Sequence, residues 1–345
     1  MDNKIYSAKE FAQALNISKN HLLKLEGEGR VPSARRKQCG KVEHRYYTVE
    51  DVVTYRQALG IPPLIDERRI QLFLNFKGGV GKSTISASYA YVIAEMGIDV
   101  LAIDLDSQQH MTKCLGFETK LETPSIYEVL IEDWDINDVI AHTPLATLDI
   151  IPSNIKLSVI ENRLPNKDMK EFLLTYALNK IQCKDYKVIV IDSLPNITLL
   201  NKNAILAADD LLIPVLPDFL SYDGLKLLIE ELARMDKAYS LYTNLRRGGL
   251  LDHIYVIINQ YRPNESLSRQ SRAALEKNYS EYLCQAIIPY NTKFAQSTAA
   301  GKPIFQYQRK GSAAKQIRAL MEEILKLGDA VPKKGKRTSK TEEML

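Results

Sequence analysis

The chain has 345 residues, of which 45% are hydrophobic and 26% are charged. These values are typical of a globular protein with room for two domains. No apolar run approaches the roughly 20 residues that cross a bilayer, and the opening MDNKIYSAKEF lacks the apolar segment of a signal peptide. We therefore expect a cytoplasmic protein without membrane contact. The 4 cysteines show no CxxC spacing, which argues against a thiolate metal site or a disulfide framework.

The net charge of +4 is unevenly distributed along the chain. Residues 1–69 and residues 331–345 each contain more Lys and Arg than Asp and Glu, whereas the segment between them is slightly acidic. Basic ends on an acidic body indicate that the ends contact a polyanion. We expect residues 331–345 to form a basic, disordered tail.

Residues 1–60 predict a small helical domain. Ser7 with Glu10 three residues later forms a capping box at the start of a short helix. Ser18 is expected to cap a second helix that carries Leu22 and Leu25 on its inner side. A helix, a short turn and a second helix is the arrangement that places the second helix in a DNA major groove.

A basic segment, RVPSARRKQCGKVEHRYYTVEDV, follows the second predicted helix. It predicts a β-hairpin and then a third helix capped by Thr48, with Asp51 three residues later. Clustered Lys and Arg side chains typically contact phosphates, so we favour DNA binding. The alternative is a small interaction domain whose charges are only solvated. The candidate DNA contacts are Lys19, Asn20, His21, Lys24, Arg35, Arg36 and Arg45.

Residues 61–69, which begin with an Ile-Pro-Pro run after Gly60, are the expected linker. Beyond them, runs of Val, Ile and Leu alternate with helical patterns, which indicates a parallel sheet covered on both faces. The fold class is therefore α/β, with a doubly wound, mostly parallel sheet over residues 70–330. The expected strands span residues 70–76, 99–104, 187–192, 210–215 and 253–259, and the expected helices include 83–97 and a last amphipathic helix with Ile317, Leu320, Met321, Ile324 and Leu325 on one stripe.

The stretch FKGGVGKST, residues 76–84, lies between a predicted strand and a predicted helix. A glycine-rich turn in that position allows backbone N–H groups to approach phosphates. Lys82 would neutralise the β- and γ-phosphates, and the Ser83 hydroxyl would hold Mg²⁺. Two features differ from the ordinary motif: Phe76 replaces its first Gly, and Lys77 is an additional lysine. The alternative is a glycine-rich turn without a ligand.

Carboxylates follow two of the predicted strands at the ends where ligands collect in open parallel sheets. Asp192 ends KVIVID and matches a Walker B aspartate that holds Mg²⁺ through water. Asp104 and Asp106 lie in LAIDLDSQ, directly after the second strand. A single carboxylate in such a place is often only a helix cap. Together with the loop, these residues predict a site for Mg²⁺ and nucleotide, with Ser83, Asp104 and Asp192 as the candidate metal residues.

These motifs resemble the ParA/MinD group of deviant Walker A ATPases, whose loop reads KGGxGK[ST]. KGGVGKS matches this loop, IDLDSQ resembles the group's IDLDPQ, and NAILAADDLLIPVLPDFLSYDGL and IIPYNTKFAQSTAAGKPI resemble later family segments in the same order. The resemblance covers about residues 70–327 and implies a Mg²⁺-dependent ATPase with ATP as its nucleotide. The chain departs from the group's DPQGN, since it has Ser107, Gln109 and His110 there.

The resemblance also implies roles for single residues. Lys77 would reach across a dimer interface to the partner's nucleotide, which would make pairing depend on ATP. Asp106 would position the attacking water, so the implied catalytic residues are Lys77, Lys82 and Asp106. Asn259 and Pro289 would line the adenine. The implied nucleotide contacts are Lys77, Gly78, Gly79, Val80, Gly81, Lys82, Ser83, Thr84, Asn259 and Pro289.

Residues 5–59 resemble a MerR-type winged helix-turn-helix. SAKEFAQALNIS matches the first helix and turn of that family, and HRYYTVEDV is similar to its RRYSxEDL. MerR proteins often add an effector domain and a coiled coil, which this chain lacks, so its dimerisation must come from elsewhere. In ParA proteins, nonspecific DNA binding uses basic residues near the closing segment. Lys293 is the positional match there, and further candidates are Arg269, Arg272, Arg309, Lys310 and Lys315.

The resemblances together imply a ParA-type DNA partition ATPase. An ATP dimer would bind nucleoid DNA nonspecifically, a ParB-like centromere-binding partner would stimulate hydrolysis, and the N-terminal domain would repress its own operon. Two alternatives stay open. The first is a transcriptional regulator that uses nucleotide only as a sensed ligand, and the second is a MinD-like positioning ATPase whose last helix binds lipid.

Overall fold

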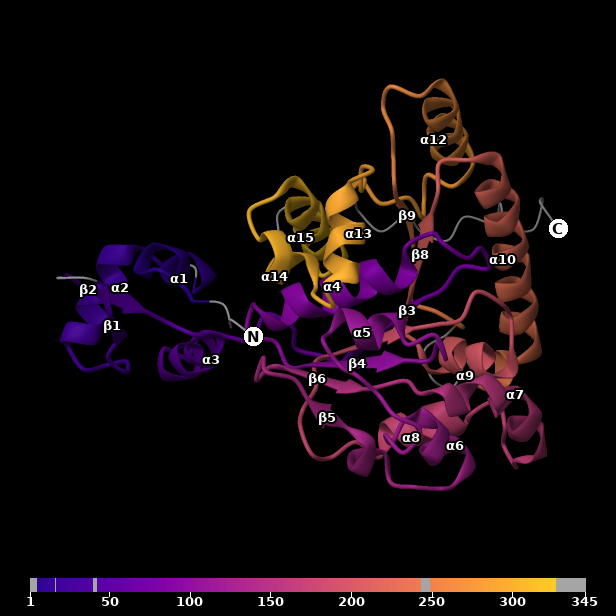
Figure 1. Ribbon diagram of the computed structural model, residues 1–345, viewed down its shortest axis with the longest axis horizontal. Coiled ribbons are helices and arrows are strands. Elements are labelled where there is room, and N and C mark those ends of the chain that lie inside the picture. Colours follow the sequence, from indigo (N-terminus) through magenta and orange to yellow (C-terminus); the bar gives the residue numbers. More distant parts are fainter. Residues whose placement is uncertain (1–4, 16, 40–41, 243–248, 327–345) are drawn as a thin grey trace.

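The computed structural model describes residues 5–15, 17–39, 42–242 and 249–326. A small N-terminal unit lies beside a larger α/β body (Figure 1). The body contains a seven-stranded sheet of order β5-β6-β4-β7-β3-β8-β9, in which only the β5–β6 pair is antiparallel. The predicted α/β class is therefore confirmed, while the expected tail 331–345 lies outside the described residues.

The strands consist largely of apolar residues because most of the strands are buried on both faces of the sheet. Every residue of β4, β6, β7 and β8 is buried. The five predicted strands are present, and the first one is shorter than expected, since it ends at Phe73. The bounds are β3 Arg69–Phe73, β4 Val100–Asp104, β5 Ala141–His142, β6 Leu148–Ile151, β7 Val188–Asp192, β8 Asp210–Val215 and β9 His253–Ile258.

Alternate residues of each strand contribute to two separate hydrophobic clusters, one on each face of the sheet. On one face the strands pack against α4, α5, α14 and α15, and on the other against α6 to α10 and α12. The last apolar stripe packs chiefly on α4, within the hydrophobic cluster on this face of the sheet. The bounds are α4 Lys82–Ala94, α5 His110–Cys114, α6 Ile126–Ile131, α7 Ile160–Arg163, α8 Leu173–Asn179, α9 Leu199–Ala207, α10 Phe219–Ala238, α12 Ser266–Asn278, α13 Thr292–Ala299, α14 Ile304–Gln308 and α15 Ser312–Ile324.

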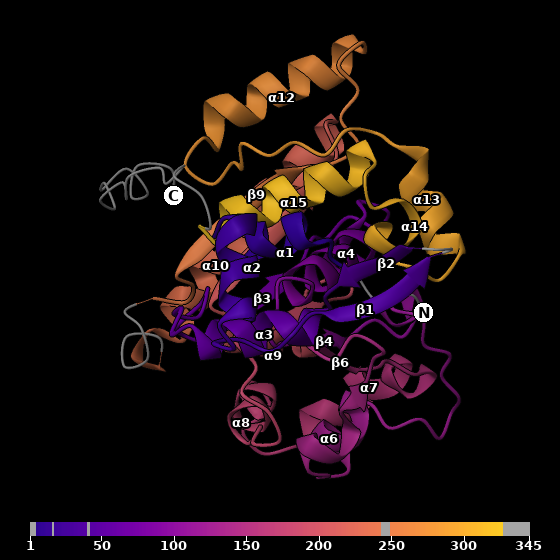
Figure 2. The same ribbon diagram turned by 90° about the vertical axis from the view of Figure 1, so that its left-hand side faces the viewer.

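The N-terminal unit contains three helices and an antiparallel hairpin, with every predicted cap in place. Both reciprocal hydrogen bonds of a capping box are present at Ser7 and at Thr48, and the Ser18 hydroxyl accepts from the His21 N–H. Figure 1 shows α1 and α3 nearer the body, with α2 and the hairpin farther out, and in Figure 2 the N-terminal unit lies in front of the body. The bounds are α1 Ala8–Ala14, α2 Lys19–Gly27, β1 Arg35–Cys39, β2 Val42–Tyr46 and α3 Val49–Ala58.

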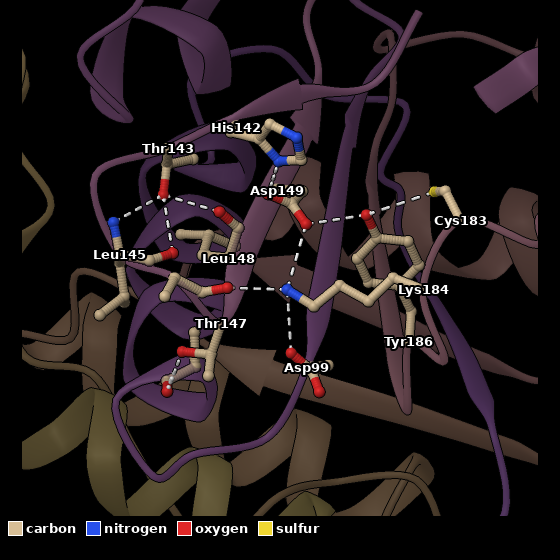
Figure 3. Close-up of polar contacts among 12 residues, drawn as sticks. Asp99, His142, Thr143, Leu145, Thr147, Leu148, Asp149, Cys183, Lys184 and Tyr186 are labelled. Atoms are coloured by element: carbon tan, nitrogen blue, oxygen red, sulfur yellow. Dashed lines mark hydrogen bonds and ion pairs between the residues drawn. The ribbon is translucent and has the colours of Figure 1, made fainter. Parts of the chain in front are cut away.

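A polar network closes the sheet at the edge where β4, β6 and β7 begin (Figure 3). Its centre is the buried Asp149 carboxylate, which accepts hydrogen bonds from the Tyr186 hydroxyl at 2.8 Å and from Lys184 Nζ at 3.2 Å. It also contacts His142 Nδ1 at 2.8 Å. Lys184 Nζ lies 2.9 Å from Asp99 Oδ1 as well. Burial and the neighbouring Asp149 raise the pKa of Tyr186, which therefore stays protonated as a donor.

Candidate functional site

The loop between β3 and α4 adopts a conformation that requires glycine. Gly79 and Gly81 have φ angles of +74° and +87°, in the left-handed region that side chains disfavour. A Cβ added to Gly81 would lie 2.5 Å from Asn259 Nδ2. That nitrogen donates to the Val80 carbonyl at 2.7 Å. Asn259, which follows β9, therefore holds the loop in place across 179 residues of sequence.

A cavity of about 720 Å³ opens over this loop at the carboxyl edge of the parallel strands. Most of the predicted nucleotide contacts line it, and the buried Val80 lies beneath the loop. The sequence did not predict the other lining residues, several of which lie within the closing segment that resembles the family. The predicted lining residues are Gly78, Gly79, Gly81, Lys82, Ser83, Thr84, Asp106, Asn259 and Pro289, and those not predicted include Gln260, Tyr290, Phe294 and Thr298.

The Asp192 carboxylate is fully buried beneath this cavity. Within the described residues, neither of its oxygens has a hydrogen-bond partner. Burial and the nearby Asp104 raise the pKa of Asp192 to about 8, while the Ser83 hydroxyl and the Lys82 ammonium oppose this rise. A buried anion without partners is costly, so this carboxylate suits a divalent cation, with the Ser83 hydroxyl as a second oxygen ligand.

Asp104 occupies a different environment although it lies beside Asp192 in the sheet. Its oxygens accept hydrogen bonds from the Thr112 N–H at 2.8 Å, the Thr112 hydroxyl at 2.7 Å and the Asp106 N–H at 3.0 Å. Burial raises its pKa to about 6 despite these donors. Its carboxylate ties α5 to the segment that carries Asp106, whose own Oδ1 accepts from the Gln108 N–H at 2.9 Å.

Lys77 is directed into its own chain. Its ammonium lies 2.7 Å and 3.0 Å from the two Asp218 oxygens and 3.3 Å from the Ser221 hydroxyl. Asp218 caps α10, so this contact connects the loop to the first turn of that helix. Burial opposes ionisation of Asp218, but the Lys77 ammonium and the Ser221 N–H outweigh it, and the pKa of Asp218 is lowered.

Lys82 is almost entirely buried at the start of α4. Burial lowers the pKa of its ammonium group, and the carboxylates of Asp192 and Asp106 counteract that effect. A lysine at this place, held between a helix N-terminus and two acids, is poised to exchange them for an incoming anion. Among the described residues, no group of three or more His, Cys, Asp and Glu side chains could hold a metal ion. Mg²⁺ in nucleotide sites typically takes one or two protein ligands together with phosphate oxygens and water.

The candidate DNA contacts on α2 form one exposed set, comprising Lys19, Asn20, His21 and Lys24. The arginines of the hairpin are also exposed, but each is paired with an acid. Arg35 lies 3.4 Å from Asp51, and Arg36 lies 2.8 Å from Glu43. Arg45 lies 2.5 Å from the buried Glu26 carboxylate.

The candidate DNA contacts on the body differ in exposure and in whether their side chains are bonded to other residues. Lys293 Nζ bonds the Gln296 side chain at 2.9 Å at the rim of the cavity. Arg272 pairs with Glu276 at 2.7 Å, and the guanidinium of Arg269 donates to a backbone carbonyl. Arg309 is engaged with the buried Glu95 at 2.6 Å. Lys310 and Lys315 are exposed.

A family model and several known proteins match the α/β body of this chain. A family model described as an AAA domain, AAA_31, matches residues 68–246. The cell division protein PomZ of Myxococcus xanthus is 37% identical over 94% of this chain and 94% of its own length. The sporulation initiation inhibitor protein Soj of Bacillus subtilis is 30% identical over 74% of this chain and 98% of its own.

Solved structures show the same fold. A putative plasmid partition protein from Borrelia burgdorferi bound to AMPPNP superposes with a TM-score of 0.63 at 24% identity, covering 76% of this chain and all of its own. Cobyrinic acid a,c-diamide synthase from Mycobacterium smegmatis, with bound ATP analogue and magnesium, gives 0.62 at 24% identity, covering 75% and 95%. Within the residues that the structure describes, no helix has the length and apolar character to span a membrane.

The family model begins at residue 68, so the winged helix-turn-helix assignment of the N-terminal unit stays a prediction. The body has the glycine loop and the mostly parallel sheet of a P-loop ATPase, and the family model and the relatives indicate the same family. This chain belongs to the ParA/MinD family of P-loop ATPases.

Proposed function

We propose that the chain is a ParA-type partition ATPase that binds and hydrolyses ATP with Mg²⁺ in this cavity. The observation that carries the proposal is the buried Asp192 carboxylate, which lies beside Ser83 and Lys82 at the end of a glycine loop and whose oxygens have no hydrogen-bond partner among the described residues. Ser83 and Asp192 hold the metal ion, which neutralises phosphate charge when bound. Lys82 contacts the β- and γ-phosphates, and the loop N–H groups surround them.

Asp104 then acts through its neighbours and not as a direct metal ligand. Its three donors come from Thr112 and from the Asp106 N–H, so it fixes the segment that presents Asp106 to the cavity. Asp106 orients the attacking water. Asn259, whose amide nitrogen is occupied by the loop, directs its remaining oxygen to the base beside Pro289.

Nucleotide-dependent pairing makes this chemistry a switch. Lys77 leaves Asp218 and contacts the nucleotide of a second copy of the chain, an attraction that exists only when ATP is bound between two subunits. The paired form binds nucleoid DNA nonspecifically through basic residues near Lys293. A ParB-like centromere-binding protein stimulates hydrolysis, and the N-terminal unit represses the operon as a winged helix-turn-helix.

Two measurements test the proposal. In gel shifts with random-sequence duplex DNA, wild type should bind with ATP and lose binding without it, whereas Lys82→Ala should show no nucleotide response. Arg234→Gln is the matched control, because Arg234 is exposed and pairs with Glu231 in its own helix. Binding that ignores both nucleotide and Lys82 would contradict the proposal.

Phosphate release then separates an ATPase from a regulator that only senses nucleotide. A sensor has no need for a residue that orients water, so Asp106→Ala should leave its behaviour unchanged. We expect Asp106→Ala to bind ATP and to release phosphate at a rate at least tenfold below wild type. Equal rates would favour the sensor. A lipid-binding role for α15 is disfavoured, since Ile317, Leu320 and Ile324 are buried.

A second candidate function is the positioning of cell division instead of DNA. The observation in its favour is the 37% identity to PomZ, which extends over 94% of this chain and therefore reaches into the N-terminal unit. Deletion of the coding region in the source organism distinguishes the two. Loss of a replicon or of chromosome segregation supports partition, and misplaced septa with normal segregation support division-site positioning.

A further inference from the structure

A buried charge pair lies where the N-terminal unit meets the body, far from the nucleotide cavity. Glu95, which caps the C-terminus of α4, is fully buried, and its carboxylate pairs with Arg309 at 2.6 Å. The hydroxyl of Tyr6, from the N-terminal unit, donates to the Glu95 backbone carbonyl. This carbonyl belongs to the last turn of α4, which has no donor of its own inside the helix.

Apolar contacts surround this polar centre. Gly97 has a φ angle of +82°, and a Cβ there would lie 3.0 Å from Val52 of α3. Buried side chains of the N-terminal unit, such as Phe11, belong to the same hydrophobic cluster as Ile317 and Ile324 of α15. Domains usually move relative to one another unless the interface between them is substantially apolar. Here a shared core and the hydrogen bond from Tyr6 to the Glu95 carbonyl oppose such motion, and the pairing of Glu95 with Arg309 fixes the Glu95 side chain beneath this contact.

The same contact is connected to the nucleotide cavity. Arg309 directly follows α14, which bonds α4 through Gln306 and the Tyr91 hydroxyl at 3.1 Å. The preceding helix, α13, lines the cavity, and its Thr298 lies 3.3 Å from Thr84 of the loop. The N-terminal unit therefore contacts the end of α4, the helix that begins at the nucleotide loop. Glu95 at this contact is paired with Arg309, which follows the helices of the cavity wall in sequence.

We propose that Tyr6, Glu95 and Arg309 hold the N-terminal unit in one orientation on the body, so that two paired bodies present their α2 helices at one fixed spacing. The partner that fits is duplex DNA with two half-sites at that spacing, since the spacing of two reading helices selects the spacing of half-sites. The DNA step rests on the proposed nucleotide-dependent pairing, whereas the orientation within one chain does not.

Spin labels test the orientation. One label is placed on the exposed Cys183 and the other on Ser33→Cys. Cys39→Ser is added so that no third thiol reacts. The labelled chain is diluted with unlabelled protein, so that the distance is measured within one chain. Wild type should give a single narrow distance distribution, and Tyr6→Phe with Glu95→Gln should broaden it. Tyr6→Phe alone, which removes one hydroxyl, should broaden it less. Arg234→Gln should leave it narrow. A broad wild-type distribution, or a double variant as narrow as wild type, would overturn the proposal.

Selection from a random duplex DNA pool in the presence of Mg²⁺ and AMPPNP tests the DNA step. Wild type should enrich two half-sites at a single spacing, and the loosened double variant should enrich half-sites at several spacings. Single half-sites or mixed spacings with wild type would overturn the fixed spacing. If wild type enriches no sequence, the inference that α2 recognises DNA sequence is contradicted. A narrow distribution of label distances would still establish the fixed orientation of the N-terminal unit. Failure of pairing itself is detected separately, as a single-chain mass with AMPPNP.

Discussion

Asp149 and Asp210 at one edge of the central sheet differ from Asp192 at the other edge in whether their buried carboxylates are hydrogen-bonded. At the edge where the strands begin, Asp149 is bonded by Tyr186 and Lys184 (Figure 3), and Asp210 is bonded by Arg69, Gln71 and His253. At the edge where they end, Asp192 has no hydrogen-bond partner within the described residues. A saturated carboxylate stabilises the fold, whereas an unsaturated one is available to a ligand.

The largest effect is expected for Asp192→Asn. Removing the charge that holds Mg²⁺ should lower ATP hydrolysis by about 100-fold or more. Without nucleotide, the variant should unfold at the same temperature as wild type or a higher one, because a buried unpaired charge is lost. Phosphate release and thermal unfolding of the same preparations measure both. A marked loss of nucleotide-free stability would show that Asp192 supports the fold.

The reverse pattern is expected for Asp149→Asn. The neutral side chain weakens charge-assisted hydrogen bonds to Lys184 and Tyr186, so the free energy of unfolding should fall by roughly 2 kcal/mol. Affinity for ATP should stay unchanged, since the network lies at the opposite edge of the sheet. Urea unfolding and nucleotide titration test this. Weaker ATP binding without loss of stability would contradict the contrast between the edges.

A smaller effect is expected for Asp218→Asn, which removes the partner of Lys77 within its own chain. The two side chains are 27% and 31% exposed, and ion pairs of this kind contribute about 1 kcal/mol or less. Releasing Lys77 should therefore lower the ATP concentration needed for pairing by up to about fivefold. Glu231→Gln, which breaks an exposed pair on the same helix, should leave it unchanged. A higher requirement in Asp218→Asn would indicate that Asp218 assists pairing.

The two edges should also respond oppositely to pH. The folded-state pKa of Asp192 is raised to about 8, above that of an unfolded aspartate near 4, so this group lowers stability as pH rises between those values. Burial opposes ionisation of Asp210, but His253 and Arg69 outweigh it and lower its pKa. Asp210 therefore adds stability above pH ~4, which is lost as pH falls further. Without nucleotide, the stability difference between Asp192→Asn and wild type should grow from pH 5 to pH 8.

Local signals in the sequence predicted much of the fold. Ser7 and Thr48 form their capping boxes because a cap depends on residues three positions apart. Long apolar runs predicted five strands, whereas β5 and β6 were missed because Ala141–His142 and Leu148–Ile151 are too short to show a pattern. The glycine loop and Asp106 were located from their positions after strands.

The remaining site features depend on contacts between distant residues. Nothing near Lys77 indicates that Asp218 holds it. The LAIDLDSQ motif does not reveal that Asp104 accepts hydrogen bonds from Thr112, whereas Asp192 has no hydrogen-bond partner in the part of the chain that the structure describes. Arg309 was a candidate for DNA binding because the resemblance places basic residues near the closing segment in contact with DNA. Its pairing with Glu95 required the packing of α14 against α4.

Light scattering during size-exclusion chromatography tests the central claim most directly. With Mg²⁺ and AMPPNP, wild type should elute with the mass of two chains, and without nucleotide with the mass of one. Lys82→Ala and Asp192→Asn should keep the mass of one chain in both conditions. A wild-type mass that does not change with nucleotide would contradict the account of the carboxyl edge as a nucleotide-dependent switch.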